Sequence, residues 1–219
     1  MLHTDLTQKI ITSLKPEGWS EIGDGVRRYL LEENTKQNLE TCILEYHAGA
    51  KYPEGTLLGT EEILVLDGTL ISAEGDHPTG SYLRNPQSLL HTTSSSTGCR
   101  IFVKRTQENR EDQHKVRIST HHTPWRQGHG NLQVMPLFSS GTEGSALVKW
   151  PAGERFVRHT HFGGEEIFVL KGEFIDEFGR YPKHTWIRSP HLSSHYPFVE
   201  EETIIFVKTG HLLIRDSKT

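Results

Sequence analysis

The chain has 219 residues, 34% of them hydrophobic, which is enough for one large domain or two small ones. Its net charge of -4 provides no broad basic surface, so binding to nucleic acid or to an anionic membrane is disfavoured. The start, MLHTDLTQKI, has no basic region followed by an apolar core, and no long apolar run occurs later. We therefore expect a cytoplasmic protein.

The first expected element lies near the N-terminus. Its apolar residues recur at helical spacing: Leu2, Leu6, Ile10 and Leu14. However, residues 9–19 match residues 115–125 at an offset of 106, and the later copy contains VRIS shortly before Pro124. Since β-branched residues favour strands and a nearby proline disfavours a helix, we predict a strand in both copies.

Short segments of alternating polarity follow along the rest of the chain. Examples are TCILEYH, EEILVLD, ALVKW and TIIFVK. They are bounded by glycine and proline clusters at the spacing expected of antiparallel sandwiches or barrels, and helix signals are nearly absent. The chain is therefore predicted to be all-β.

An internal duplication organises the sequence. Residues 41–104 align without a gap with residues 145–208, and about 20 of these 64 positions are identical. A period of this length indicates a duplicated domain rather than a solenoid. We predict two tandem barrels, residues 1–106 and 107–219, with the charged run RTQENREDQH at 105–114 as the connection.

The two cysteines, Cys42 and Cys99, are widely spaced, and each lies in an apolar, strand-like context. We predict that both are small buried apolar residues without a redox or disulfide role.

The second copy contains a set of metal-binding residue types. His159 and His161 are two residues apart, so on a strand both side chains would point the same way. Glu165 follows, and His195 comes thirty residues later. Three imidazoles and one carboxylate suit a divalent ion such as Zn, Fe(II), Mn, Ni or Co.

This motif resembles the cupins, small double-sheet β-barrels of the jelly-roll or double-stranded β-helix type. The matching pattern is Gly153-x5-His159-x-His161-x3-Glu165-x6-Gly172, followed by Pro190-x4-His195. Residues 159–190 are closer still to the C-terminal cupin domain of ChrR anti-sigma factors. The resemblance implies that His159, His161, Glu165 and His195 bind one divalent transition metal ion per chain, with Zn or Fe(II) expected first and Mn or Ni also compatible.

Two residues depart from the family pattern. Leu192 stands where the second motif usually has glycine, and Val199 replaces an asparagine that can follow the last histidine. Neither position is a ligand, so the departures concern the shape of the turn.

The first copy lacks two of the four ligands. The aligned residues are Gly55, Leu57, Glu61 and His91. One carboxylate and one imidazole bind a divalent ion weakly, so we expect the first barrel to be metal-free. His47 or His77 would be the substitute ligands if it did bind an ion, and a buried Glu61–His91 hydrogen bond is the simpler explanation of the retained pair.

Other charged residues receive structural assignments. Glu166 is expected to face the outer surface or an interface, with support of the metal ligands as the alternative. Asp176 and Glu177 are expected to be solvated turn acids. Arg84 and Arg188 occupy equivalent positions in both copies, which favours structural ion pairs. Five further histidines are expected at the surface, the last two near the pocket mouth: His121, His122, His129, His184 and His191.

Two classes of function remain open. The ChrR resemblance implies a metal-dependent regulatory domain that responds to an oxidant or a small molecule. No cysteine precedes Cys42 and no helical bundle is predicted, so we expect neither the zinc-binding anti-sigma domain of ChrR proteins nor contact with a sigma factor. Alternatively, the 3-His, 1-Glu set resembles mononuclear non-haem dioxygenases that cleave β-diketones or hydroxyacetophenones, and metal-dependent isomerases. A small-molecule ligand or substrate is expected either way, catalytic residues are not assigned, and a homodimer is an open alternative to barrels that pair within one chain.

Overall fold

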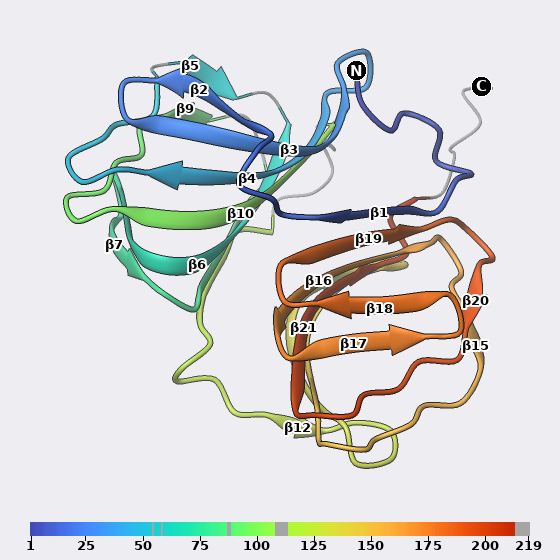
Figure 1. The fold of residues 1–219 in the computed structure, drawn as a ribbon. Helices are drawn as coiled ribbons and strands as arrows, with labels where there is room; N and C mark the ends of the chain where they lie inside the picture. The colour runs from blue at the N-terminus through green and yellow to red at the C-terminus, as the bar shows by residue number, and fades with distance from the viewer. Residues whose placement is uncertain (54, 58, 87–88, 108–113, 213–219) are drawn as a thin grey trace. The chain divides into compact units, whose positions relative to one another are not determined.

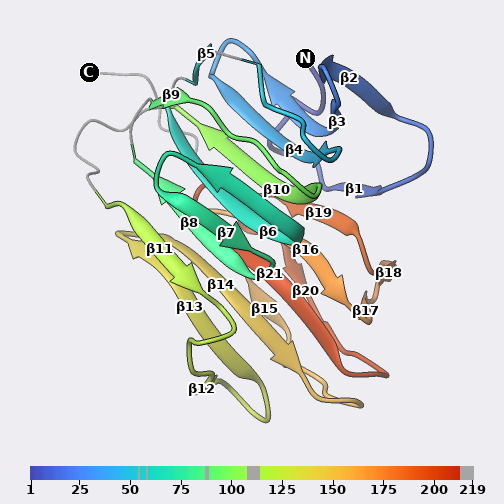
Figure 2. The same ribbon diagram turned by 90° about the vertical axis from the view of Figure 1, so that its left-hand side faces the viewer.

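A computed structural model describes residues 1–53, 55–57, 59–86, 89–107 and 114–212, with the backbone alone for residues 55–57 and 89–91. Its described residues form strands and turns without a helix (Figure 1; Figure 2), which confirms the all-β prediction. No helix long and apolar enough to cross a membrane was found among them. The strands fall into two units.

The first unit comprises Met1–Thr4 and Lys15–Thr123. Its strands are β2 (Trp19–Gly23), β3 (Val26–Asn34), β4 (Leu39–Tyr46), β5 (Gly55–Leu57), β6 (Thr60–Ser72), β7 (Gly75–Pro78), β8 (Ser81–Asn85), β9 (Leu89–His91), β10 (Cys99–Thr106) and β11 (Val116–Ser119). The main antiparallel sheet has the order β11-β8-β6-β10-β4-β3-β2, with β7 added to β6, and β5 pairs with β9 in a separate ribbon.

The second unit comprises Asp5–Leu14 and the chain from Pro124 onward. Its strands are β1 (Ile10–Ser13), β12 (Arg126–Gln127), β13 (Gln133–Ser140), β14 (Glu143–Trp150), β15 (His159–Thr160), β16 (Glu165–Lys171), β17 (Glu173–Asp176), β18 (Gly179–Pro182), β19 (Thr185–Ser189), β20 (Ser194–His195) and β21 (Thr203–Thr209). The main sheet has the order β1-β19-β16-β21-β14-β13-β12, and β15-β20 and β17-β18 form two ribbons.

The first strand of each sequence copy belongs to the unit formed by the other copy. Strand β1 pairs with β19 (Figure 1), with Ile10 opposite Arg188, and β11 pairs with β8, with Val116 opposite Arg84. Both segments are therefore strands, as predicted, and residues 5–14 complete the second unit. The proposed boundary at 106/107 follows the sequence repeat, whereas the units in space exchange these strands.

The two cores use corresponding residues. In the second unit, Ile167 and Val169 on β16 alternate with residues of the opposite face and pack with Ile187 and Ile205. The residues 104 positions earlier form the core of the first unit, which also contains Cys42 and Cys99. Both cysteines are buried and free, as predicted. Burial of each large aliphatic side chain contributes about 1.5–3 kcal/mol.

Equivalent glycines with positive φ occur in both copies, Gly68 within β6 and Gly172 between β16 and β17. Gly68 and Gly172 both have φ +72°, and a Cβ atom on Gly172 would lie 2.6 Å from the carbonyl oxygen of Glu202. Only glycine fits this conformation and this close approach. The motif glycine therefore allows the chain to bend between β16 and β17 beside the barrel wall.

Candidate metal centre

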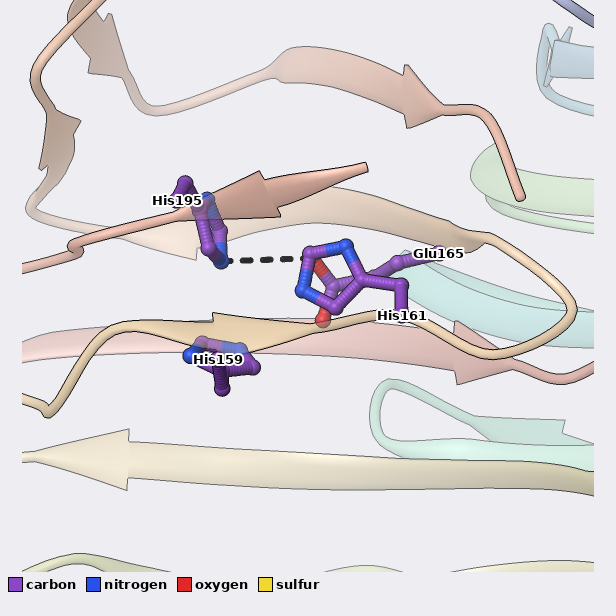
Figure 3. Close-up of side chains that lie close together, drawn as sticks. All are labelled: His159, His161, Glu165 and His195. Atoms are coloured by element: carbon purple, nitrogen blue, oxygen red, sulfur yellow. Dashed lines mark ion pairs between the residues drawn. The ribbon is translucent and has the colours of Figure 1, made fainter. Parts of the chain in front are cut away.

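The four predicted ligands come together at one end of the second barrel. Strands β15 and β20 form an antiparallel ribbon in which His159 lies opposite His195. His161 follows β15 directly, and Glu165 is the first residue of β16. Figure 3 shows the four side chains grouped in a small volume. Three segments, the chain at β15, the start of β16 and β20, thus supply donors to one group.

The distances between donor atoms suit a shared ion. His161 Nε2 lies 3.5 Å and His195 Nε2 lies 3.7 Å from Glu165 Oε2. One ligand atom from each of the four residues, His159 included, can be chosen so that all lie within 4.8 Å of one another. Atoms that each bind one cation at about 2.1 Å must lie roughly 3–4 Å apart. The observed separations are in or just above that range.

The hydrogen bonds of the imidazoles leave one ring nitrogen of each available. The Nδ1 atom of His159 contacts the carbonyl oxygen of Val157 (3.1 Å), that of His161 contacts Ser193 Oγ (3.2 Å), and that of His195 contacts Asp176 Oδ2 (3.3 Å). A carbonyl or a carboxylate can only accept, so His159 and His195 carry the proton on Nδ1 and have a lone pair on Nε2. Such outer contacts orient imidazoles for metal binding.

Two buried atoms of the cluster lack any hydrogen-bond partner. They are His161 Nε2 and Glu165 Oε2, and both residues are buried. An unsatisfied buried polar atom costs about 1–3 kcal/mol, so such atoms are rare without a role. A divalent cation would satisfy both, because each is a lone-pair donor facing the other. The residues present therefore fit a metal ion.

Burial shapes the protonation of the cluster without a cation. Burial raises the pKa of Glu165 to about 7, although the neighbouring His195 and Lys9 oppose this rise. Burial also lowers the pKa of His161 to about 3, with His195 and His159 acting in the same direction. Near neutral pH His161 is thus a neutral imidazole, the form that binds metal, and a bound cation would favour the ionised form of Glu165.

Asp176 corrects the sequence-based assignment. It was expected to be a solvated turn acid, but it is buried, and its carboxylate accepts hydrogen bonds from His195, Lys9 (3.0 Å) and Tyr181 (2.7 Å). Burial opposes ionisation, yet the hydrogen bonds from His195, Tyr181 and Lys9 hold the pKa of Asp176 well below its usual value. An anionic Asp176 therefore supports one of the ligands.

The acids Glu166 and Glu177 differ in burial, and only Glu177 lies where it was expected. Glu166 is also buried, against the expectation of an outer-surface position, because Trp186 Nε1 donates to it (3.3 Å) and His211 Nε2 lies 2.8 Å from it. Glu177 is exposed, as expected of a turn acid, and accepts a hydrogen bond from the backbone of Tyr196.

The remaining charged positions are mostly structural. Arg84 lies 4.0 Å from Glu62, an ion pair as predicted, and Arg188 donates to the carbonyl oxygen of Asp5. Of the five histidines that were expected at the surface, four are exposed: His121, His122, His129 and His191. His184 is half-buried and stacks on Phe168. His191 lies beside the ligand loop, because its Nδ1 atom accepts a hydrogen bond from the backbone of Gly163.

The corresponding place in the first barrel keeps the same backbone register. Gly55 lies opposite His91, as His159 lies opposite His195. The side chains of residues 55, 57 and 91 lie outside the described part, so the Glu61–His91 pair and the metal-free state stay predictions. Glu61 itself is buried and accepts a hydrogen bond from Arg105 Nε at 3.0 Å. A guanidinium therefore supplies, inside this barrel, positive charge beside the retained carboxylate.

The two barrels also differ at the position of Asp176, the residue that contacts the ligand His195. The residue equivalent to Asp176 is Ser72, which contacts His77 Nε2 at 2.8 Å, where the second barrel has an Asp176–Tyr181 hydrogen bond. A cavity of about 70 Å³ borders Ser72, His77 and Leu70. Of the two equivalent positions, only the one in the barrel with the complete ligand set thus has a carboxylate. The sequence repeat contained this signal, but our sequence analysis did not use it. His47 and His77 belong to no cluster of three or more ligand groups found among the described residues.

The fold and the donor set define a two-barrel cupin. The family model for the ChrR Cupin-like domain matches residues 7–109 and again residues 113–213, so the chain belongs to this family. Comparison with functionally curated proteins found no match.

Several solved structures share the fold. A candidate dioxygenase from Nostoc punctiforme is 14% identical, with a TM-score of 0.75 over 96% of this chain and 85% of that chain. The protein Ylba from E. coli is 14% identical, with a TM-score of 0.70 over 98% and 94%. An oxalate decarboxylase variant from B. subtilis is 13% identical, with a TM-score of 0.68 over 91% and 76%. These likenesses concern the cupin fold.

Proposed function

We propose that the second barrel binds one divalent transition metal ion through His159, His161, Glu165 and His195. The observation that carries this proposal is the convergence of four donors in which two buried atoms, His161 Nε2 and Glu165 Oε2, have no other partner. Nitrogen-rich ligation with one carboxylate suits Zn or Fe(II) first, and Mn or Ni also.

The centre has one side from which a small molecule can approach. His161, Glu165 and His195 are buried, whereas His159 is only half-buried. A ligand would reach the donor atoms past His159, while the buried residues exclude water from the other sides. The ion, when bound, would supply a positive charge that polarises an oxygen-containing ligand or, as Fe(II), an affinity for O2.

We propose that this centre serves a regulatory or sensory role in response to an oxidant or a small molecule. Membership in the ChrR Cupin-like family supports this role. The second candidate is an enzyme, either a mononuclear non-haem dioxygenase acting on diketones or hydroxyacetophenones or a metal-dependent isomerase. The half-open ligand set and the fold shared with a candidate dioxygenase and an oxalate decarboxylase support that candidate.

Metal analysis of protein purified without added metal tests these proposals. We expect one equivalent of a divalent metal per chain, most of which is lost in His161→Ala and kept in His129→Ala, a control that removes an exposed histidine of the same barrel. Unchanged occupancy in His161→Ala would refute the ligand assignment.

The two roles are separated by oxygen uptake. Stoichiometric metal without O2 consumption or turnover on a panel of diketones and hydroxyacetophenones supports the sensory role. Bound Fe(II) together with O2 uptake on one of these compounds supports the dioxygenase and contradicts a purely sensory function.

A further inference from the structure

A lysine from the exchanged N-terminal segment reaches the surroundings of the metal centre. Lys9 directly precedes β1, in the segment Asp5–Leu14 that belongs to the second unit. Its Nζ atom lies 3.0 Å from Asp176 Oδ2, and the same oxygen lies 3.3 Å from His195 Nδ1. Lys9, Asp176 and the ligand His195 thus form one continuous chain of charged and polar contacts.

Asp176 does not depend on Lys9 for its position. Its other oxygen, Oδ1, accepts hydrogen bonds from Tyr181 Oη (2.7 Å) and from the backbone nitrogens of Phe178 (2.8 Å) and Gly179 (3.1 Å). The side chain of Asp176 is 1% exposed, whereas that of Lys9 is 25% exposed. Removal of the ammonium group would therefore leave the carboxylate in place and change mainly the charge around it.

We propose that Asp176 and Lys9 are positioning residues that tune the affinity of the metal centre in opposite directions. Asp176 fixes the ring of His195 and places negative charge behind it, so that Nε2 becomes a stronger donor. Lys9 offsets this charge and adds a positive charge near the cation, which weakens cation binding. This inference rests on the proposed metal centre.

The first unit contains a matched contrast. Lys115 occupies the position equivalent to Lys9, and its Nζ atom pairs with Glu74. No carboxylate stands at the position of Asp176, where the first copy has Ser72. The complete chain of contacts therefore occurs in the unit that has the full ligand set, as expected if its role concerns the metal.

The test is the dissociation constant for Zn²⁺, measured on the full-length protein by competition with a chelator at pH 7.5. We expect Asp176→Asn to bind about 10- to 100-fold more weakly. We expect Lys9→Met to bind about three- to tenfold more tightly, because it keeps the packing of the stem and removes the charge. Lys9→Arg keeps the charge and should match the unaltered protein, as should the control Lys115→Met.

Opposite changes in Zn²⁺ affinity in Asp176→Asn and Lys9→Met distinguish tuning of the metal centre from a purely structural role. A merely structural pair would weaken binding in both variants, so weaker binding in Lys9→Met, or unchanged binding in Asp176→Asn, would overturn the inference. The absorption spectrum of bound Co²⁺ gives a second readout, which should shift in Asp176→Asn and stay constant in Lys115→Met. Zn²⁺ retained by His161→Ala would instead refute the metal centre itself.

Discussion

Replacement of Glu165 by glutamine should stabilise the metal-free protein above neutral pH. Burial raises the pKa of this carboxyl from 4.5 to about 7, so the unfolded chain ionises first as the pH rises. Stability is then lost between these two values and stays low above the folded pKa. From pH 5 to pH 8 this loss is about 2–3 kcal/mol, since one pKa unit corresponds to about 1.4 kcal/mol. Glutamine has nearly the same shape and no proton to lose.

Urea denaturation with a chelator present measures this effect. Trp125, Trp150 and Trp186 belong to the second unit and only Trp19 to the first, so tryptophan fluorescence reports mainly on the barrel of interest. The difference in unfolding free energy between Glu165→Gln and the unaltered protein is compared at pH 5 and pH 8, which cancels effects of the substitution that do not depend on pH.

The expected result is that Glu165→Gln gains about 2–3 kcal/mol over the unaltered protein between pH 5 and pH 8. Added Zn²⁺ should then stabilise the unaltered protein and leave the variant nearly unchanged, because the variant lacks the carboxylate ligand. If the unfolding free energies of the two proteins change equally from pH 5 to pH 8, ionisation of the buried Glu165 does not destabilise the fold, and the reasoning is refuted.

Three further substitutions test the fold. Leu192 is exposed and has φ +62°, so Leu192→Gly should raise the unfolding free energy by about 0.5–1 kcal/mol in urea denaturation; a loss would contradict the strain argument. Arg105→Leu should destabilise the first barrel by about 3–5 kcal/mol, because it removes the guanidinium that pairs with the buried carboxylate of Glu61; this is checked by urea denaturation followed by far-UV circular dichroism, and a neutral effect would disprove it. Gly172→Ala would place a Cβ atom 2.6 Å from a backbone oxygen, whereas Gly153→Ala meets nothing within 4 Å. The first should therefore lower the melting temperature clearly more than the second, and equal shifts would argue against the close approach.

Residues whose environment follows from local pattern were predictable from the sequence. The alternation of His159 and His161, the spacing to Glu165 and the duplication predicted both the strands and the grouped donors. The second strand copy, VRIS, also identified the N-terminal segment as a strand, although its own spacing resembled a helix.

Residues whose environment depends on distant segments were not predictable in this way. Asp176 looks like a hairpin acid until Lys9 and His195 pack against it, and Glu166 looks like a surface residue until Trp186 and His211 cover it. Alternation along a strand gives the face on which a side chain lies. It does not give what covers that face.

The exchange of first strands has a consequence for the order in which the protein folds. Ile10 is synthesised long before Arg188, its partner in the β1–β19 pair. Contacts between such distant residues form slowly, because a long loop must close before they contribute any stability. The edge of β19 therefore stays uncovered until late in folding. Until β1 pairs with it, this edge can pair wrongly with another strand.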